Sequence, residues 1–404
     1  MHAQRIIQDL LDTACPNIHL KRRKCIATIV DAGSRGKLFL MGISRSLSNA
    51  TSIRHRIKRC DRLLGNHKLE AERLTIYGAM TKRILLGIKQ PLIIIDWSDL
   101  LPDRSLQLLR AAVVIKGRAM TIYEEVHPIS CAMSPTIHRD FLDKLRTILP
   151  SHSQPICITD AGFRSTWFAL LNQRGWAWVG RIRNRDMVLS AEKNQSWIGC
   201  KTLYSKASCQ AKDLGKFQYV RKHPVACRLV IIKKKALGRH QKTVRGEIRK
   251  SAQSLKQSQG QKEPWLLVVS PLLNQLSAEG VVAIYRSRMQ IEQTFRDVKN
   301  SRWGLSLSES QTRQPRRLAT LLLIGALACY ALWIIGLLVK SLNFSMEFGS
   351  KKKAKTALST ISLARCWIRE TSSIILTARQ INNALSMLRT LILDVHQQIL
   401  QLQI

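Results

Sequence analysis

The chain has 404 residues, and its 65 Lys and Arg residues against 26 Asp and Glu residues give a formal net charge of +39. This length predicts several domains with a large core, and the charge predicts a polyanionic partner such as DNA, RNA, ribosomes or an anionic membrane, without selecting a reaction. The ten cysteines include no C-x2-C pair, which argues against a zinc site, and the first residues contain no apolar signal core. We therefore expect a protein of the reducing cytoplasm.

Residues 1–80 have the pattern of a helical and very basic DNA-binding domain. Helices expected over residues 42–47 and 52–59 are separated by a turn at residues 48–50, which is typical of a helix-turn-helix. In this interpretation the second helix carries Arg54, Arg56, Lys58 and Arg59 into a major groove. A solvated pair of basic helices without groove contacts is the alternative.

Two short apolar runs, residues 91–96 and 155–160, each end in an aspartate, Asp96 and Asp160. Runs of this length that are rich in Ile and begin with Pro predict buried strands. Each Asp is then expected at the carboxyl end of its strand and before a sharp turn, where open α/β sheets hold their active sites. Either residue alone is also a common turn former or helix cap.

A hairpin is expected beside the strand of Asp96, formed by residues 110–115 and 119–126. It carries Glu124 and Glu125, each of which is either a spare metal ligand or a solvent-facing strand residue. With this hairpin, residues 90–185 form the expected first part of a catalytic domain.

Residues 186–275 lack helical periodicity and are strongly basic. Between Lys201 and Lys262 there are 17 Lys or Arg residues and two acids. We expect this insertion to lie along DNA.

Tyr285, Arg288, Glu292 and Lys299 form a Y-x2-R-x3-E-x6-K pattern. Offsets of 3, 7 and 14 residues return to nearly the same face of one helix, so a carboxylate is expected between a phenol and two cations. On such a face the carboxylate can hold a metal ion while the phenol and the two cations contact a neighbouring phosphate. An amphipathic helix with a solvated charged side is the alternative.

Asp96, Asp160 and Glu292 together make an all-oxygen ligand set, which suits Mg²⁺ or Mn²⁺ and not zinc. Two such ions about 4 Å apart would lower the pKa of an attacking water and stabilise the leaving 3′ oxygen of an in-line displacement.

Residues 318–339 are almost wholly apolar, and by hydropathy alone they are a candidate for a transmembrane helix. The competing interpretation, which we adopt, is a helix buried on all sides in a large core. Residues 276–340 are then the second part of the catalytic domain, and residues 341–404 are a helical C-terminal region. Its apolar stripe is either intramolecular core or a dimer seam.

The chain resembles the DDE transposases of bacterial insertion sequences, in particular the cut-and-paste group that forms DNA hairpins, and it looks closest to the transposon ten type. The matching segments are residues 61–66 (DRLLGN), 93–99 (IIIDWSD), 159–163 (TDAGF) and 285–299. The Tyr-Arg-Glu-Lys signature is complete. The resemblance implies an α/β fold in which a ribonuclease-H-like mixed sheet is interrupted by a β-rich insertion.

The resemblance also implies residue roles. Asp96, Asp160 and Glu292 are the expected catalytic, metal-binding triad, and the residues expected to contact phosphates beside the cut are Tyr285, Arg288 and Lys299. Trp265 lies where the family supports a flipped base. Arg181 and Arg183 are further candidates for contacting the hairpin. The alternative role for Trp265 is the start of a core strand.

The implied reaction is nicking at the transposon end, hairpin formation on the opposite strand, hairpin opening by water and strand transfer into target DNA. The implied partners are double-stranded DNA and a second copy of the chain in a synaptic homodimer, with no membrane. The alternatives are a metal-dependent nuclease without strand transfer, an inactive transposase-derived DNA-binding protein, a repressor and a basic membrane protein.

Overall fold

The computed structural model describes residues 2–47, 51–183, 186–192, 195–234, 247–248, 251–252, 254–255, 263–301, 304–342, 358–370 and 376–402. The chain divides into two compact units. The first consists of residues 1–153 and 289–396, and the second consists of residues 154–288 and 397–404.

The first unit is mostly helical, with a three-stranded antiparallel sheet in the order β3-β2-β1. Its strands are β1 (Leu92–Asp99), β2 (Leu106–Ile115) and β3 (Arg118–Pro128). Its helices are α1 (His2–Ala14), α2 (Leu20–Arg35), α3 (Leu40–Ser46), α4 (Ile53–Leu64), α5 (His67–Ile84), α6 (Pro135–Ile148), α10 (Gln290–Lys299), α11 (Pro315–Ser341), α12 (Thr360–Glu370) and α13 (Ala378–Leu400), with short 3₁₀ helices η1 (Ile129–Cys131) and η4 (Leu307–Glu309). The last residues of α13 belong to the second unit.

The β2–β3 pair confirms the predicted hairpin beside the strand of Asp96. Both helices of the predicted helix-turn-helix are present as α3 and α4. The turn expected at residues 48–50 lies outside the described residues.

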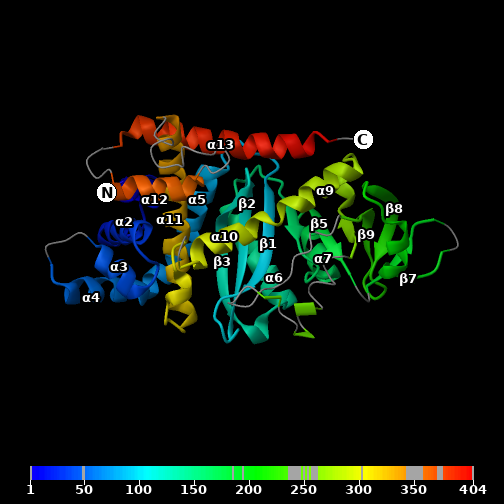
Figure 1. The fold of residues 1–404 in the computed structure, drawn as a ribbon, viewed down its shortest axis with the longest axis horizontal. Coiled ribbons are helices and arrows are strands. Elements are labelled where there is room, and N and C mark those ends of the chain that lie inside the picture. Colours follow the sequence, from blue (N-terminus) through cyan, green and yellow to red (C-terminus); the bar gives the residue numbers. More distant parts are fainter. Residues whose placement is uncertain are drawn as a thin grey trace. The chain divides into compact units, whose positions relative to one another are not determined.

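Helix α11 is the core of the first unit (Figure 1). All residues from Leu318 to Val339 are buried, and α11 packs against α1, α2, α4, α5, α12 and β3. It is long and apolar enough to cross a membrane, with a mean hydropathy of 2.5 over its most apolar window, yet every residue of that window is buried inside the protein. A helix that is apolar on all sides needs such a surrounding layer. Gly336 permits the close approach of α12, because a Cβ there would overlap the carbonyl of Thr360.

The second unit contains a mixed sheet in the order β4-β5-β10-β9-β8-β6-β7. Only the β4–β5 pair is parallel, and the other neighbours are antiparallel. The strands are β4 (Ile156–Thr159), β5 (Ala177–Ile182), β6 (Met187–Ser190), β7 (Ile198–Gly199), β8 (Lys212–Tyr219), β9 (Val225–Ile232) and β10 (Trp265–Val269). The helices are α7 (Ser165–Gln173) and α9 (Ala278–Ser287), with 3₁₀ helices η2 (Cys200–Lys206) and η3 (Pro271–Leu273).

Five of these strands, β6 to β10, come from the basic residues 186–275, which explains why this stretch has no helical periodicity. Apolar side chains of β5, β9 and β10 are buried along their whole length or nearly so. Together the two units give a mixed α/β protein.

Candidate active site

Asp96 lies inside β1 and not at its end. Leu92 to Ile95 are buried, Asp96 is half-buried, and the strand continues to Asp99. The predicted sharp turn after Asp96 is therefore wrong, because the residues after it keep pairing with β2 up to the Asp99–Gln107 pair. The apolar run marks only the buried half of the strand.

Arg110 of β2 is directly opposite Asp96, and Glu124 of β3 is directly opposite Arg110. The guanidinium of Arg110 donates to Glu124 Oε2 from both Nε and Nη2 at 2.7 Å, and the two side chains are 1% and 2% exposed. The hydroxyl of Tyr77 donates to Glu124 Oε1 at 3.1 Å. Glu124 is thus a buried ion-pair partner, and both roles expected for it, spare metal ligand or solvent-facing residue, are wrong.

Glu125 points to the other face of the sheet and also has several partners. It accepts hydrogen bonds from the Tyr123 hydroxyl at 2.6 Å and Lys144 Nζ at 2.7 Å, and its Oε2 lies 2.8 Å from His127 Nε2. Burial acts to raise the pKa of Glu125, but the hydrogen bonds from His127, Lys144 and Tyr123 outweigh it and lower this pKa to about 2.

Helix α10, which carries Glu292 in its first turn, packs on the face of the sheet that bears Asp96. Directly opposite residues of an antiparallel pair point to the same face, so Asp96 and Arg110 share one face. The guanidinium of Arg110 lies 4.6 Å from the ring centroid of Phe295 on α10. Phe295 is one helical turn beyond Glu292, which is exposed. The fold thus places the helix that carries Glu292 over the sheet face that bears Asp96.

Three polar contacts fix α10 on this face. The Thr294 hydroxyl donates to the carbonyl of Ala119 at 2.7 Å, and Arg118 forms an ion pair with Asp297 at 2.5 Å. Lys299, at the end of the helix, contacts the end of β1.

Lys299 Nζ donates to the Ser98 hydroxyl at 2.9 Å and to the carbonyl of Asp99. Burial and the nearby Arg110 guanidinium lower the pKa of Lys299 to about 8. In this structure the ammonium therefore holds α10 to β1, two residues beyond Asp96.

Two neutral histidines brace β1 on either side of Asp96. His138 Nε2 accepts a hydrogen bond from the Trp97 indole N–H at 3.0 Å. His396 Nδ1 accepts one from the backbone N–H of Leu92 at 3.4 Å, and its Nε2 lies 3.0 Å from the carbonyl of Val114. Burial lowers the pKa of each histidine to about 4.

These histidines predict acid lability. In the unfolded chain each takes up a proton near pH 6.5, whereas the folded protein takes it up only near pH 4. Their contribution to stability is therefore complete above about pH 6.5 and is lost as the pH falls toward 4, on the order of 3 kcal/mol for each residue. We expect the melting temperature to fall steeply in this window. His138→Gln, whose amide oxygen still accepts from Trp97, should flatten the fall, and an unchanged slope would contradict this role.

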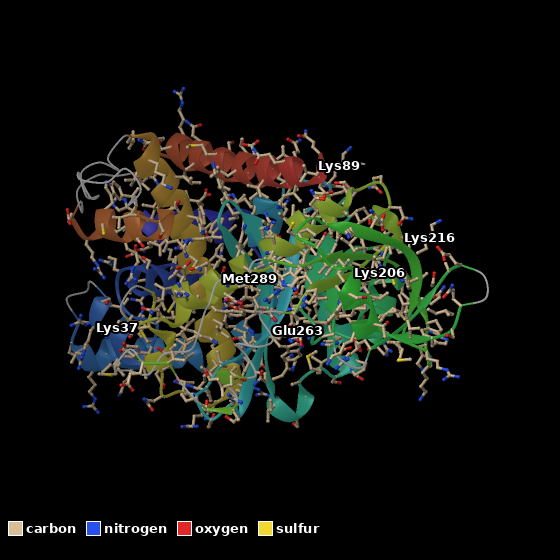
Figure 2. All side chains as sticks on the ribbon, turned by 45° about the vertical axis from the view of Figure 1, so that its right-hand side comes forward. Lys37, Lys89, Lys206, Lys216, Glu263 and Met289 are labelled. Atoms are coloured by element: carbon tan, nitrogen blue, oxygen red, sulfur yellow. The ribbon has the colours of Figure 1, made fainter. Side chains whose placement is uncertain are left out.

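The four residues of the Tyr-Arg-Glu-Lys pattern do not lie on one helix: Tyr285 is on α9, Arg288 is in the turn after it, and Glu292 and Lys299 are on α10. Helix α9 ends at Ser287, and α10 begins at Gln290, directly after Met289, which Figure 2 labels. The Ser287 hydroxyl donates to the carbonyl of Ile284, the acceptor that a continuous α-helix would give to the N–H of Arg288. That N–H bonds to Tyr285 instead. The predicted single helical face is wrong, because Arg288 and Met289 interrupt the helix.

Asp160 immediately follows β4 in the second unit, as the sequence predicts. Its Oδ1 accepts a hydrogen bond from the N–H of Gly162 at 2.8 Å, which closes the turn after the strand. The residue is half-buried. Asp160 therefore forms the turn, which was the alternative role stated for it above. The exposed part of its carboxylate can also serve as a metal ligand.

Trp265 is the first residue of β10 and is partly exposed. Its ring meets the buried Tyr285 ring edge-on, with centroids 4.9 Å apart, and Lys234 Nζ lies 3.4 Å from its centroid. Burial and the nearby Arg286 lower the pKa of Lys234 to about 8. The structure agrees with the strand-start interpretation of Trp265, and it also leaves part of the indole accessible.

Arg181 and Arg183, from β5 and the residue just after it, are held by the segment that precedes β10. Arg183 donates to Glu263 Oε2 from Nε at 2.8 Å and from Nη2 at 2.5 Å (Figure 2 labels Glu263). Arg181 donates to the carbonyl of Pro264 at 3.2 Å, and burial lowers its pKa. In the register of the β5–β10 pair, Leu266 is opposite Ile182, so the backbone of Trp265 runs beside the segment that carries Arg181 and Arg183.

The basic residues predicted on α4 differ in their surroundings. Arg54 and Lys58 are exposed, and Arg59 is half-buried. Arg56 is also half-buried, and it donates to the carbonyl of Leu47 at 2.8 Å. Arg56 thus links α4 to the end of α3.

The donor set fits a hard divalent cation in its chemistry, because Asp96 and Glu292 have carboxylate oxygens and neither residue is fully buried. Within the described ranges, no group of three or more His, Cys, Asp or Glu residues is clustered closely enough to hold a metal.

The Arg110–Glu124 pair was missed by sequence reasoning. Its signal was available, since Arg110 is the one charged residue in the run 106–115.

The family model described as Transposase DDE domain matches residues 89–331, which is more than half of the chain and includes Asp96, Asp160 and Glu292. A search of curated proteins gives no match.

Proposed function

Because this chain belongs to the Transposase DDE domain family and is a DDE-type, DNA-processing enzyme, we propose that it moves an insertion sequence by cut-and-paste transposition. The proposed route is that of the hairpin-forming group and closest to its transposon ten type. It proceeds through nicking at the element's ends, hairpin formation, hairpin opening and strand transfer.

The observation that carries the proposal is the placement of α10 on the sheet. The helix that carries Glu292 lies over the sheet face that bears Asp96, and the contacts of Phe295 with Arg110 and of Lys299 with Ser98 hold the helix there. Phosphoryl transfer depends mainly on such positioning and on electrostatic stabilisation.

We assign the catalytic carboxylates to Asp96, Asp160 and Glu292, which would hold two Mg²⁺ or Mn²⁺ ions. Ions in such a site lower the pKa of the attacking water and offset charge on the leaving 3′ oxygen. Without a cation, clustered carboxylates repel one another, so bound metal should also order them.

Tyr285, Arg288 and Lys299 are assigned to the phosphates beside the cut. An ammonium has three N–H donors, and Lys299 uses two of them on Ser98 and Asp99, so it can add a phosphate contact without leaving β1. Its pKa of about 8 keeps it largely charged at neutral pH.

DNA recognition is assigned to residues 1–80, with Arg54, Lys58 and Arg59 of α4, and to the basic insertion at residues 186–275. Arg56 can contribute charge while it holds α3 to α4. Joining two ends requires two active sites, so we propose a synaptic homodimer on double-stranded DNA in the bacterial cytoplasm.

Trp265 is the proposed support for a base that leaves the stack when the hairpin closes, with Arg181 and Arg183 gripping the hairpin backbone. Lys234 covers the indole at 3.4 Å in this structure, so a stacked base takes the other face or displaces the lysine.

Trp265→Ala should leave first-strand nicking nearly intact and lower hairpin formation by roughly one to two orders of magnitude, since base stacking contributes about 1 to 3 kcal/mol. Trp265→Phe should recover part of the loss because it keeps a smaller π-face. Both products can be quantified in one time course. Equal losses of nicks and hairpins would show that Trp265 acts only as a strand residue.

The whole route is tested by incubating the protein with Mg²⁺ and DNA that carries the element's own ends, and by resolving the products on denaturing gels. Transposition predicts nicks, hairpins and joined products. Nicks without hairpins or joined products would indicate a nuclease, and binding without any cut would indicate an inactive DNA-binding protein or repressor.

A further inference from the structure

A basic cavity of about 590 Å³ opens between the start of α2, one side of α4 and the start of α5, all within the first unit. Among the described residues that line it, five are Lys or Arg and none carries a carboxylate. The five cations are Lys21, Arg22, Lys58, Arg59 and Arg62. His19 and His55 also line it, so the α2–α4 cleft, as we name it, is cationic on both sides.

The spacing along α4 explains how one wall arises. His55, Lys58, Arg59 and Arg62 are three or four residues apart and therefore share a face of the helix. Arg54, also on α4, does not line the cleft. The cleft shares Lys58 and Arg59 with the set that a recognition helix was expected to insert into a groove, and it adds Arg62 of α4 together with Lys21 and Arg22 of α2.

The other wall is the beginning of α2. Its first turn contains no acidic residue, and the positive end of the helix dipole adds to the field of Lys21. Arg22 forms an ion pair with Glu72 of α5 at 3.0 Å. The charge of Arg22 is thereby compensated, and the cleft still holds a large excess of positive charge over negative.

We propose that the α2–α4 cleft binds backbone phosphates of DNA, which makes α2 and α4 a two-sided clamp on the sugar–phosphate backbone. The inference rests on the proposed function, because that function supplies the DNA. Phosphate contacts fix the register of a protein on the duplex but carry no sequence information. This clamp therefore contributes affinity and orientation, and sequence discrimination lies elsewhere.

The full-length protein tests the clamp through the salt dependence of its binding to a short DNA duplex of arbitrary sequence. Lys21→Gln/Arg62→Gln removes one exposed cleft cation from each wall, and neither residue belongs to the expected recognition set. The logarithmic salt slope should fall by roughly 2, at about 0.9 for each lost phosphate contact. The matched control is Lys24→Gln/Lys68→Gln, which removes two exposed cations of α2 and α5 outside the cleft. Its slope should change by less than about 0.5, because neither side chain lines the cleft and the slope counts only phosphate contacts that are lost.

Cys25, a partly buried residue that lines the cleft, provides a second readout. Duplex DNA at about ten times Kd should slow alkylation of Cys25 roughly tenfold, whereas the partly buried Cys366 of α12 should react at an unchanged rate. Mass spectrometry of the alkylated peptides measures both rates.

The possible outcomes separate the two proposals. If the wild type binds DNA but the cleft variant keeps its salt slope and Cys25 stays reactive, the clamp is wrong and the transposase proposal survives. If the wild type fails to bind any duplex, both are wrong.

Discussion

Asp96→Asn, Asp160→Asn and Glu292→Gln are each expected to reduce DNA cleavage by at least about three orders of magnitude, while binding to DNA ends persists. Each substitution keeps the size of the side chain and removes one anionic ligand. Bound cations contribute several kcal/mol to stabilising the charge of the transition state, and each 1.36 kcal/mol corresponds to about tenfold in rate. Cleavage on gels and binding by mobility shift, measured on the same preparations, check both halves of this expectation.

Glu309→Gln is a suitable control, since it removes a carboxylate of the first unit that is engaged with Lys37 at the surface. It should cleave at the wild-type rate. Near-normal nicking by any one of the three triad variants would remove that residue from the proposed ligand set.

Arg110→Met is expected to destabilise the first unit by about 3–5 kcal/mol, because it leaves the Glu124 carboxylate buried without its bidentate partner. For a unit of this size the melting temperature should fall by roughly 10 °C. The double variant Arg110→Met/Glu124→Leu should recover part of the loss, since no buried charge remains uncompensated. Thermal melting and urea titration measure the three proteins.

The control is Lys37→Met, which breaks a surface ion pair with Glu309 and should cost no more than about 1 kcal/mol (Figure 2 labels Lys37). If Arg110→Met were as mild as this control, the pair would not be a stabilising element of the sheet. If the single and double variants were equally unstable, the loss would come from packing against Phe295 and not from the orphaned carboxylate.

Features that depend on local pattern were predictable from the sequence. The Ile-rich run before Asp96 forms the buried half of β1, and the Lys-Gly-Arg turn at residues 116–118 joins the β2–β3 hairpin. The apolar stretch from Leu318 to Val339 is buried on all sides, as the interpretation of a core helix required. Each of these features depends on residues that are close together in the sequence, so a short stretch of sequence is enough to predict it.

Two other features were not predictable from local pattern. The break between α9 and α10 falls at Arg288 and Met289, where no Pro or Gly marks an interruption of the helical pattern. Glu124 looks like a solvent-facing strand residue until the register places it opposite Arg110. The spacing of the Tyr-Arg-Glu-Lys pattern predicts one face of a continuous helix, and it does not indicate that the helix is broken between α9 and α10.

The central claim, that Asp96, Asp160 and Glu292 hold the same divalent ions, is tested most directly by metal-directed cutting of the protein itself. Fe²⁺ replaces Mg²⁺, ascorbate and peroxide are added, and the radicals produced at the bound iron cut the nearby backbone. The account predicts cuts beside residues 96, 160 and 292 that excess Mg²⁺ suppresses and that Asp96→Asn abolishes together. Cuts beside 96 and 292 without one beside 160, or cuts clustered elsewhere in the chain, would contradict it.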